Sequence, residues 1–287
     1  MAKKISLALR GGLGNQLFGV ATALYLKQAL NINIRVSTLN IDKGHSVRGS
    51  NVRRMAFPKG IFLTRCEIMQ SRVKRKINFR NRLLVVIEED AAVNFNEKNE
   101  KLIISIKSLR EPGEILITGF FQDFAYANSI SNFHKYINLE DPTVNLPKNF
   151  IAVHIRLSDY QNHISTLGIL ATKYYNDAIK LALEKFDLPV LIFSDDIEAA
   201  RKMLDLNPEE NIKFMTAASM KDPLTTFKVL ARANVMILSN STFSYWAAYL
   251  NKNAQIIIYP NDFRRDGCDA IKNIPKYWTP MPSIWKD

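Results

Sequence analysis

Apolar runs alternate with helix-period segments along the whole chain, and this pattern predicts an α/β protein. Near the start, an apolar run at 5–10, a helical pattern at 16–30 and a second apolar run at 32–37 give the order strand, helix, strand. This order is typical of the opening of a doubly wound sheet. Further strands are predicted at 83–87, 102–106 and 115–118, followed by a helix at 123–136.

The second half alternates more regularly. Strands are predicted at 150–155, 190–193, 212–215, 235–238 and 255–259, and helices at 172–186, 197–204, 222–233 and 243–250. Such alternation predicts a parallel sheet covered by helices on both faces. The polar stretch 138–149 contains two prolines and is predicted to be a linker. We therefore expect two Rossmann-like domains, 1–140 and 150–287, that face each other across a cleft.

Composition narrows the class of protein. The chain has 287 residues, of which 47 % are hydrophobic, and this suits two modest domains with buried cores. Cys66 and Cys268 are far apart and belong to no cysteine or histidine cluster, so neither a disulfide framework nor a zinc site is expected. No signal peptide is recognisable, and no apolar stretch approaches the ~18 residues that a membrane-spanning helix needs. These features predict a cytoplasmic protein.

The net charge of +12 is concentrated in one segment. Between 43 and 82 Glu67 is the only acidic residue, against twelve basic ones: Lys43, Arg48, Arg53, Arg54, Lys59, Arg65, Arg72, Lys74, Arg75, Lys76, Arg80 and Arg82. This segment is either a solvated surface or a site of peripheral contact with an anionic membrane. Nucleic-acid binding is disfavoured, because few aromatic residues lie between the basic ones.

The first candidate motif is "RGGLGNQLF" at 10–18, a glycine-rich turn between a predicted strand and helix. It lacks the third glycine of a dinucleotide fingerprint and the lysine of a Walker A loop. The turn still offers the backbone N–H groups of Gly12 and Gly14 and the side chains of Asn15 and Arg10 to an anion. A tight turn without a ligand explains the glycines equally well.

The second motif, "VHIRLSDY" at 153–160, places His154 and Arg156 on one face at the end of a buried strand. Arginine binds phosphate oxygens in a bidentate manner, and a cation at a strand end suits a diphosphate. The alternative is a structural salt bridge between Arg156 and either Asp159 or Asp195.

Two further motifs follow predicted strands. In "LIFSDD" at 191–196, Ser194 and Asp195 suit a ribose or a guanine edge, although Ser194, Asp195 and Asp196 also suit the N-cap of the next helix. In "LSNSTFSYWAAYL" at 238–250, hydroxyl groups and free N–H groups open a helix and predict an anion site. Its candidate binding residues are Ser239, Asn240, Ser241, Thr242 and Phe243.

The metal-dependent arrangement of some glycosyltransferases is absent from the sequence. The chain contains no D-x-D triplet and only four histidines, so no metal is expected. No Ser/His/Asp or Cys/His nucleophile can be assembled either.

The motifs together resemble the bacterial α-1,2-fucosyltransferase family. "GGLGNQLF", "HIRLSDY", "FSDD" and "SNSTFSYWAAYL" occur in the order typical of that family, as do "GFFQDFAYA" at 119–127 and "IPKYW" at 274–278. One departure is Ser158, where the family usually has glycine in H-x-R-x-G-D-Y.

The resemblance implies a fold of the GT-B type, GDP-L-fucose as the donor, inversion at the anomeric carbon and no metal. It implies a terminal β-galactoside acceptor, which is lipid-linked in O-antigen synthesis, bound by the N-terminal domain. Arg156 and His154 would match the diphosphate site, Asp195 the guanosine site, and Asn15 the reacting centre. The chemistry of sugar transfer also requires a base for the acceptor hydroxyl, and Asp159 and Asp123 are both candidates.

Two other classes of protein explain the sequence less well. A nucleotide-dependent oxidoreductase would need the missing third glycine and an acidic residue that binds ribose. A basic binding protein without enzymatic activity would explain the charge but not the polar clusters at four strand ends.

Overall fold

The computed structural model divides the chain into two compact units, Met1–Leu139 and Glu140–Asp287. The boundary falls within 138–149, the stretch that the sequence predicts to be a linker. The structure describes residues 4–31, 33–38, 41, 51–55, 57, 60–64, 67, 84–90, 94–108, 114–137, 139, 144–204, 211–216, 220, 222–268 and 271–286.

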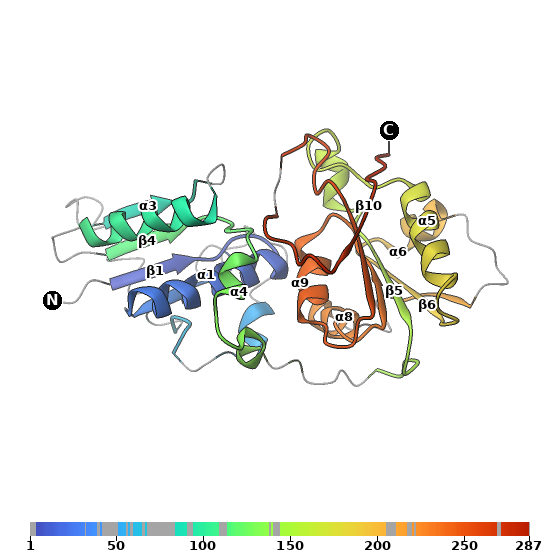
Figure 1. The fold of residues 1–287 in the computed structure, drawn as a ribbon, viewed down its shortest axis with the longest axis horizontal. Coiled ribbons are helices and arrows are strands. Elements are labelled where there is room, and N and C mark those ends of the chain that lie inside the picture. Colours follow the sequence, from blue (N-terminus) through green and yellow to red (C-terminus); the bar gives the residue numbers. More distant parts are fainter. Residues whose placement is uncertain are drawn as a thin grey trace. The chain divides into compact units, whose positions relative to one another are not determined.

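The first unit is a four-stranded parallel sheet with three α-helices among its described residues (Figure 1). Its strands are β1 (Lys4–Ala8), β2 (Ile34–Ser37), β3 (Leu84–Glu88) and β4 (Glu114–Thr118), in the order β2-β1-β4-β3. Its helices are α1 (Leu13–Leu30), α3 (Phe95–Ser108) and α4 (Ala125–Asn128), with 3-10 turns η2 (Asn51–Arg54) and η3 (Phe133–Tyr136). The carboxyl ends of the parallel strands β1 and β4 are therefore adjacent.

Two predictions in this unit are wrong. The apolar run 102–106 is helical, as part of α3, because burial recurs at helix spacing through Asn99, Leu102 and Ile106. The predicted helix 123–136 is broken into α4 and η3, since Asn132 adopts a left-handed conformation with φ of 58°. A run of β-branched residues is thus weak evidence for a strand when buried positions recur every three to four residues, as they do in a helix.

Helix α1 begins at Leu13, three residues before the predicted start, with Gly12 as its N-cap in an extended conformation. Gly19 lets this helix approach the first strand: a Cβ there would lie 2.6 Å from Leu9 Cδ2. In a dinucleotide fingerprint the third glycine allows the helix to pack closely on the strand. Here Gly19, further along α1, has that role.

The second unit is a six-stranded parallel sheet. Its strands are β5 (Ile151–Ile155), β6 (Val190–Ser194), β7 (Ile212–Phe214), β8 (Val235–Ile237), β9 (Ile256–Pro260) and β10 (Thr279–Met281). Their order, β10-β9-β8-β5-β6-β7, is the Rossmann order, with its topological switch point between β5 and β8. The expected α/β class with parallel sheets is confirmed in both units.

The helices of the second unit cover both sides of this sheet. Helices α5 (Thr172–Leu183) and α6 (Ile197–Met203) lie on one side, and α8 (Pro223–Leu230) and α9 (Thr242–Leu250) on the other (Figure 1). A 3-10 turn, η4 (Asp159–His163), follows β5. Strand β10 was not predicted, because it has only three residues and contains Pro280; it pairs with β9 at the sheet edge.

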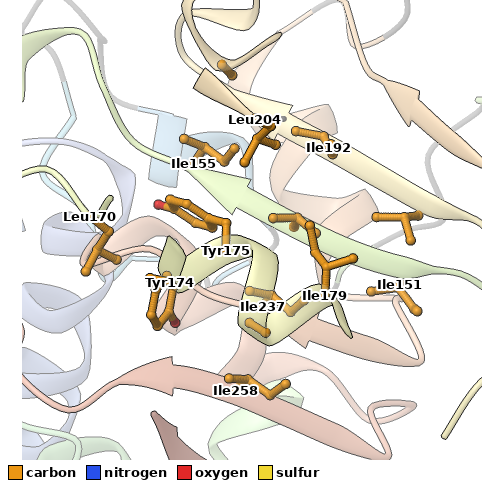
Figure 2. Close-up of a cluster of buried hydrophobic side chains, with 14 of the residues drawn as sticks. Ile151, Ile155, Leu170, Tyr174, Tyr175, Ile179, Ile192, Leu204, Ile237 and Ile258 are labelled. Atoms are coloured by element: carbon orange, nitrogen blue, oxygen red, sulfur yellow. The ribbon is translucent and has the colours of Figure 1, made fainter. Parts of the chain in front are cut away.

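The core beneath α5 fixes which side chains of β5 face away from it. Figure 2 shows Ile151 and Ile155 in this cluster with Tyr175 and Ile179 of α5. Because side chains alternate along a strand, His154 must point to the opposite face, toward α8 and α9. Packing of the hydrophobic core against α5 thus orients the His154 side chain of the central strand toward α8 and α9.

Most of the basic segment 43–82, including its basic cluster at 72–76, lies outside the described residues. Two of its arginines, Arg53 and Arg54, belong to η2. Arg53 donates to Thr38 Oγ1 at 2.9 Å and to the Leu63 carbonyl at 2.6 Å. Within the described ranges, no helix has the length and apolar character required to cross a bilayer.

Candidate functional site

The carboxyl ends of β5 and β8 meet at the switch point of the second unit, and a buried hydrogen bond joins them. His154 Nδ1 lies 2.7 Å from Ser239 Oγ, and both side chains are buried. The His154 ring stacks on Phe243 of α9 with 5.4 Å between ring centroids. These contacts hold the start of α9 against the central strand, at the edge where open α/β sheets bind ligands.

Arg156 directly follows β5 and is held by two carboxylates. Its Nη1 lies 2.8 Å from Asp195 Oδ2, and its Nη2 pairs with Asp159 Oδ1. The Arg156 side chain is only 8 % exposed, and its buried Nε has no hydrogen-bond partner among the described residues. The guanidinium also lies over the Tyr160 ring, 5.4 Å from its centroid. Both salt bridges that the sequence offered as alternatives therefore exist, and the N–H group of Nε remains for a ligand.

Asp195 follows β6, and its carboxylate reaches back to the neighbouring strand end. Besides pairing with Arg156, its Oδ1 accepts a hydrogen bond from the Leu157 N–H at 2.9 Å. Partial burial acts to raise the pKa of the Asp195 carboxyl. The Arg156 charge, the Leu157 N–H and the Ser158 hydroxyl outweigh burial and hold this pKa below its usual value. Asp195 is therefore charged at neutral pH.

Of the three residues that suit the N-cap of α6, Asp196 provides the cap and Asp195 does not. The N-cap of α6 is the next residue, Asp196, whose side chain accepts a hydrogen bond from the Ala199 N–H at 3.0 Å. Ser194 supports this turn, because its Oγ accepts from the Asp196 N–H at 3.1 Å. The two adjacent aspartates thus have different roles: Asp196 caps α6, and Asp195 pairs with Arg156.

The start of α9 is shaped by buried polar side chains. Asn240 Nδ2 donates to the carbonyls of Leu167 and Gly168 at 2.9 and 3.2 Å, while its Oδ1 is buried without a hydrogen-bond partner among the described residues. The N-cap residue, Ser241, makes no side-chain capping bond. Thr242 and Phe243 are half-buried. The N-terminus of α9 is therefore left without a capping side chain, which favours an anion there.

Three tyrosines brace this edge and were not identified from the sequence. Tyr160 OH donates to the Asn240 carbonyl and Tyr174 OH to the Leu238 carbonyl, each at 2.8 Å. Burial, assisted by the Asp195 charge, raises the pKa of Tyr175, whose hydroxyl bonds to the backbone of Arg156. Tyr174 and Tyr175 lie in the amphipathic helix α5 and Tyr160 in the polar turn η4, so only the tertiary contacts reveal their polar role.

The glycine-rich turn of the first unit has a different internal geometry from the one expected. Gly11 is the residue with positive φ, at 65°, whereas Gly12 has φ of −75° and Gly14 lies within α1. A Cβ at Gly11 would lie 2.6 Å from Asn15 Nδ2, so glycine there lets the Asn15 side chain fold over the turn. Asn15 Oδ1 accepts a hydrogen bond from Gln122 Nε2 at 2.8 Å.

The two candidate bases differ in accessibility. The Asp159 side chain is 53 % exposed. Asp123 is only 1 % exposed, and its Oδ1 accepts a hydrogen bond from the Ala125 N–H at 2.8 Å. A group that takes a proton from a substrate hydroxyl must come within hydrogen-bond reach of it, so this comparison favours Asp159.

No group of three or more His, Cys, Asp or Glu residues able to hold a metal ion occurs in the part of the chain that the structure describes. The two carboxylates near Arg156 face that guanidinium.

The sequence profile of glycosyl transferase family 11 matches residues 117–278, which span the end of the first unit and most of the second. The chain belongs to this family, the α-1,2-fucosyltransferase family. The resemblance stated from the motifs is therefore confirmed, and the polar edge at β5 and β8 lies within the matched residues.

Two relatives are similar to the chain over most of its length. An Escherichia coli α-1,2-colitosyltransferase is 25 % identical over 94 % of this chain and 96 % of its own. The O-antigen biosynthesis glycosyltransferase WbnK of Escherichia coli is 23 % identical over 88 % of this chain and 92 % of its own.

A solved structure shows the same fold. The α-1,6-fucosyltransferase NodZ, soaked with GDP-fucose, aligns with a TM-score of 0.54 over 91 % of this chain and 96 % of its own, at 14 % identity. The fold is therefore of the GT-B glycosyltransferase type, as expected.

Proposed function

We propose that this glycosyltransferase moves L-fucose from GDP-L-fucose to the 2-hydroxyl of a terminal β-galactoside, with inversion and without a metal. The membership of family 11 supports fucosyl transfer, and the similarity to WbnK supports a role in O-antigen synthesis. The acceptor is then a glycan, in the lipid-linked form if the role is O-antigen synthesis.

The observation that carries the proposal is the state of Arg156. Two carboxylates fix its guanidinium, and its buried Nε is without a partner among the described residues. A buried donor without an acceptor costs free energy, which a ligand oxygen can recover. A diphosphate oxygen suits this donor, and the N-terminus of α9 offers further N–H groups to the same anion.

The chemistry follows from these groups. As the bond between the sugar and the diphosphate breaks, negative charge grows on the leaving oxygen, and Arg156 with the α9 N-terminus stabilises it. Asp159 takes the proton from the attacking hydroxyl. Asp195 keeps Arg156 in place, and in this proposal its exposed edge faces the guanosine. Ser239 holds His154, and Asn240 holds the loop at 167–168.

The direct test is transfer activity with purified protein. GDP-L-fucose and lactose should give a trisaccharide whose new linkage, read by NMR, is α-1,2 to galactose. GDP-mannose serves as a control donor. Absence of transfer to lactose and to longer β-galactosides would contradict the proposed acceptor.

A second candidate donor sugar is colitose, since a colitosyltransferase is 25 % identical over nearly the whole chain. Colitose is fucose without its 3-hydroxyl group. A site that hydrogen-bonds this hydroxyl rejects the deoxy sugar strongly, whereas an apolar site discriminates weakly. The ratio of kcat/KM for the two GDP sugars decides between these donors.

We also expect transfer to persist in excess EDTA. Arg156 and the helix N-terminus supply the charge stabilisation that a divalent cation provides in other sites. The measurement is the initial rate with and without chelator, with Mn²⁺ or Mg²⁺ added back. Loss of activity that either ion restores would contradict the metal-free mechanism.

A further inference from the structure

The turn that follows β4 in the first unit, Gly119–Gln122, has an unusual backbone. Phe121 has φ of +50°, a conformation that a bulky side chain rarely adopts. A Cβ at Gly119 would lie 2.4 Å from the Cβ of Glu89, so the turn passes Glu89 more closely than any other residue type allows. A strained conformation of this kind persists only where its surroundings impose it.

A buried ion pair holds the turn in this shape. Glu89 Oε2 accepts the N–H groups of Phe120 and Phe121 at 2.8 and 2.6 Å, and Glu89 Oε1 accepts from Lys98 Nζ at 2.7 Å. The Lys98 and Glu89 side chains are only 6 % and 5 % exposed. Removing two charges from water is costly, so their presence here indicates that the shape of this turn matters.

The turn displays one aromatic ring and one amide. Phe121 is buried against Tyr126, at 6.1 Å between centroids, and anchors the turn from below. Phe120 is 43 % exposed, although large apolar side chains are normally buried. Two residues further along the same turn, Gln122 donates a hydrogen bond to Asn15 Oδ1 at the start of α1. The exposed ring and the amide pair lie at the carboxyl ends of the adjacent strands β4 and β1, where ligands of such sheets bind.

An exposed ring and a fixed pair of amides on the same turn are complementary to a pyranose. A sugar ring packs its C–H groups on an aromatic face, and amide groups both donate to and accept from hydroxyls. In β-galactose the axial 4-hydroxyl leaves a continuous C–H face on the other side of the ring. We propose that Phe120 with Gln122 and Asn15 binds the terminal galactose of the acceptor, and that Glu89 and Lys98 are positioning residues. The identity of the sugar rests on the proposed function.

The test measures binding of methyl β-D-galactopyranoside to the full chain by NMR titration, without GDP. Phe120→Ala is expected to weaken this binding about tenfold, as truncation of a central contact does. The affinity of the Phe120→Ala variant for GDP, measured by calorimetry, should be unchanged. Tyr277→Ala, which removes an aromatic ring that is 73 % exposed in the second unit, is the control and should leave galactoside binding as it is.

A second variant tests the positioning role of Glu89. Glu89→Gln keeps the size of the side chain but removes its charge from Lys98, so the turn should loosen. The expected result is a raised KM for the galactoside with a smaller change in kcat and an unaltered KM for the donor. Glu100→Gln, at an exposed position of α3, should change none of these values.

Binding of the galactoside and transfer of fucose are measured separately, so failure of the subsite can be distinguished from failure of the proposed reaction. Equal galactoside binding by Phe120→Ala and the natural chain overturns the subsite, and so does absence of galactoside binding by a natural chain that binds GDP. Galactoside binding that depends on Phe120, in a protein that transfers no fucose, would support the subsite while contradicting the proposed reaction.

Discussion

Replacing Arg156 with alanine is expected to lower kcat about a hundredfold, equivalent to about 3 kcal/mol of transition-state stabilisation. The diphosphate becomes more negative as the sugar leaves, so Arg156 binds the transition state more tightly than the ground state. The loss should therefore appear in kcat and not in KM alone. Arg156→Lys should recover only part of the rate, because an ammonium group lacks the planar fork of donors.

The structure changes how this experiment is interpreted. Because Arg156 pairs with both Asp159 and Asp195, its removal should also lower the melting temperature. Steady-state kinetics on the folded fraction are therefore decisive. Arg201→Ala, which removes a guanidinium of α6 that lies 4.3 Å from the centroid of the Phe214 ring, is the control and should keep the natural kcat. A folded Arg156→Ala variant with natural kcat would show that Arg156 is only a structural ion-pair partner.

Asp195→Asn is expected to lower the free energy of unfolding by about 2 kcal/mol at pH 7. The new amide side chain would keep an oxygen for the Leu157 N–H but would leave the buried Arg156 with one carboxylate. The matched control is Asp196→Asn. Asparagine caps helices as well as aspartate does, so that variant should differ from the natural chain by less than about 0.5 kcal/mol.

The stabilisation that the Asp195 charge provides should depend on pH. The pKa of Asp195 lies below its usual value of 3.8 in the folded protein. Its charge therefore stabilises the protein above that pH, and the contribution is lost as the pH falls through the lowered pKa. Urea denaturation should show the gap in the free energy of unfolding between the natural chain and Asp195→Asn closing as the pH falls below 3.8. A gap of constant size would indicate lost packing instead of lost charge.

The sequence by itself determined the fold class and most of the polar strand ends. Period-two and period-3.6 patterns are set by local geometry, so they predicted most strands and helices of the second half within a few residues. The position of Arg156 after a buried strand was also readable, because a parallel sheet places such residues at one edge. The ordered motifs indicated the family, which the match over 117–278 confirms.

Tertiary structure decided what each side chain contacts. The choice of Asp195 over Asp196 as the partner of Arg156 depends on how β6 lies against β5, a contact between residues far apart in the chain. The run at 102–106 became a helix because its packing surface, and not its β-branched composition, set its conformation. The Glu89–Lys98 pair and the turn at Phe121 could likewise not be predicted from the sequence. The ion pair indicates a special role only because it is buried, and burial is a property of the folded chain.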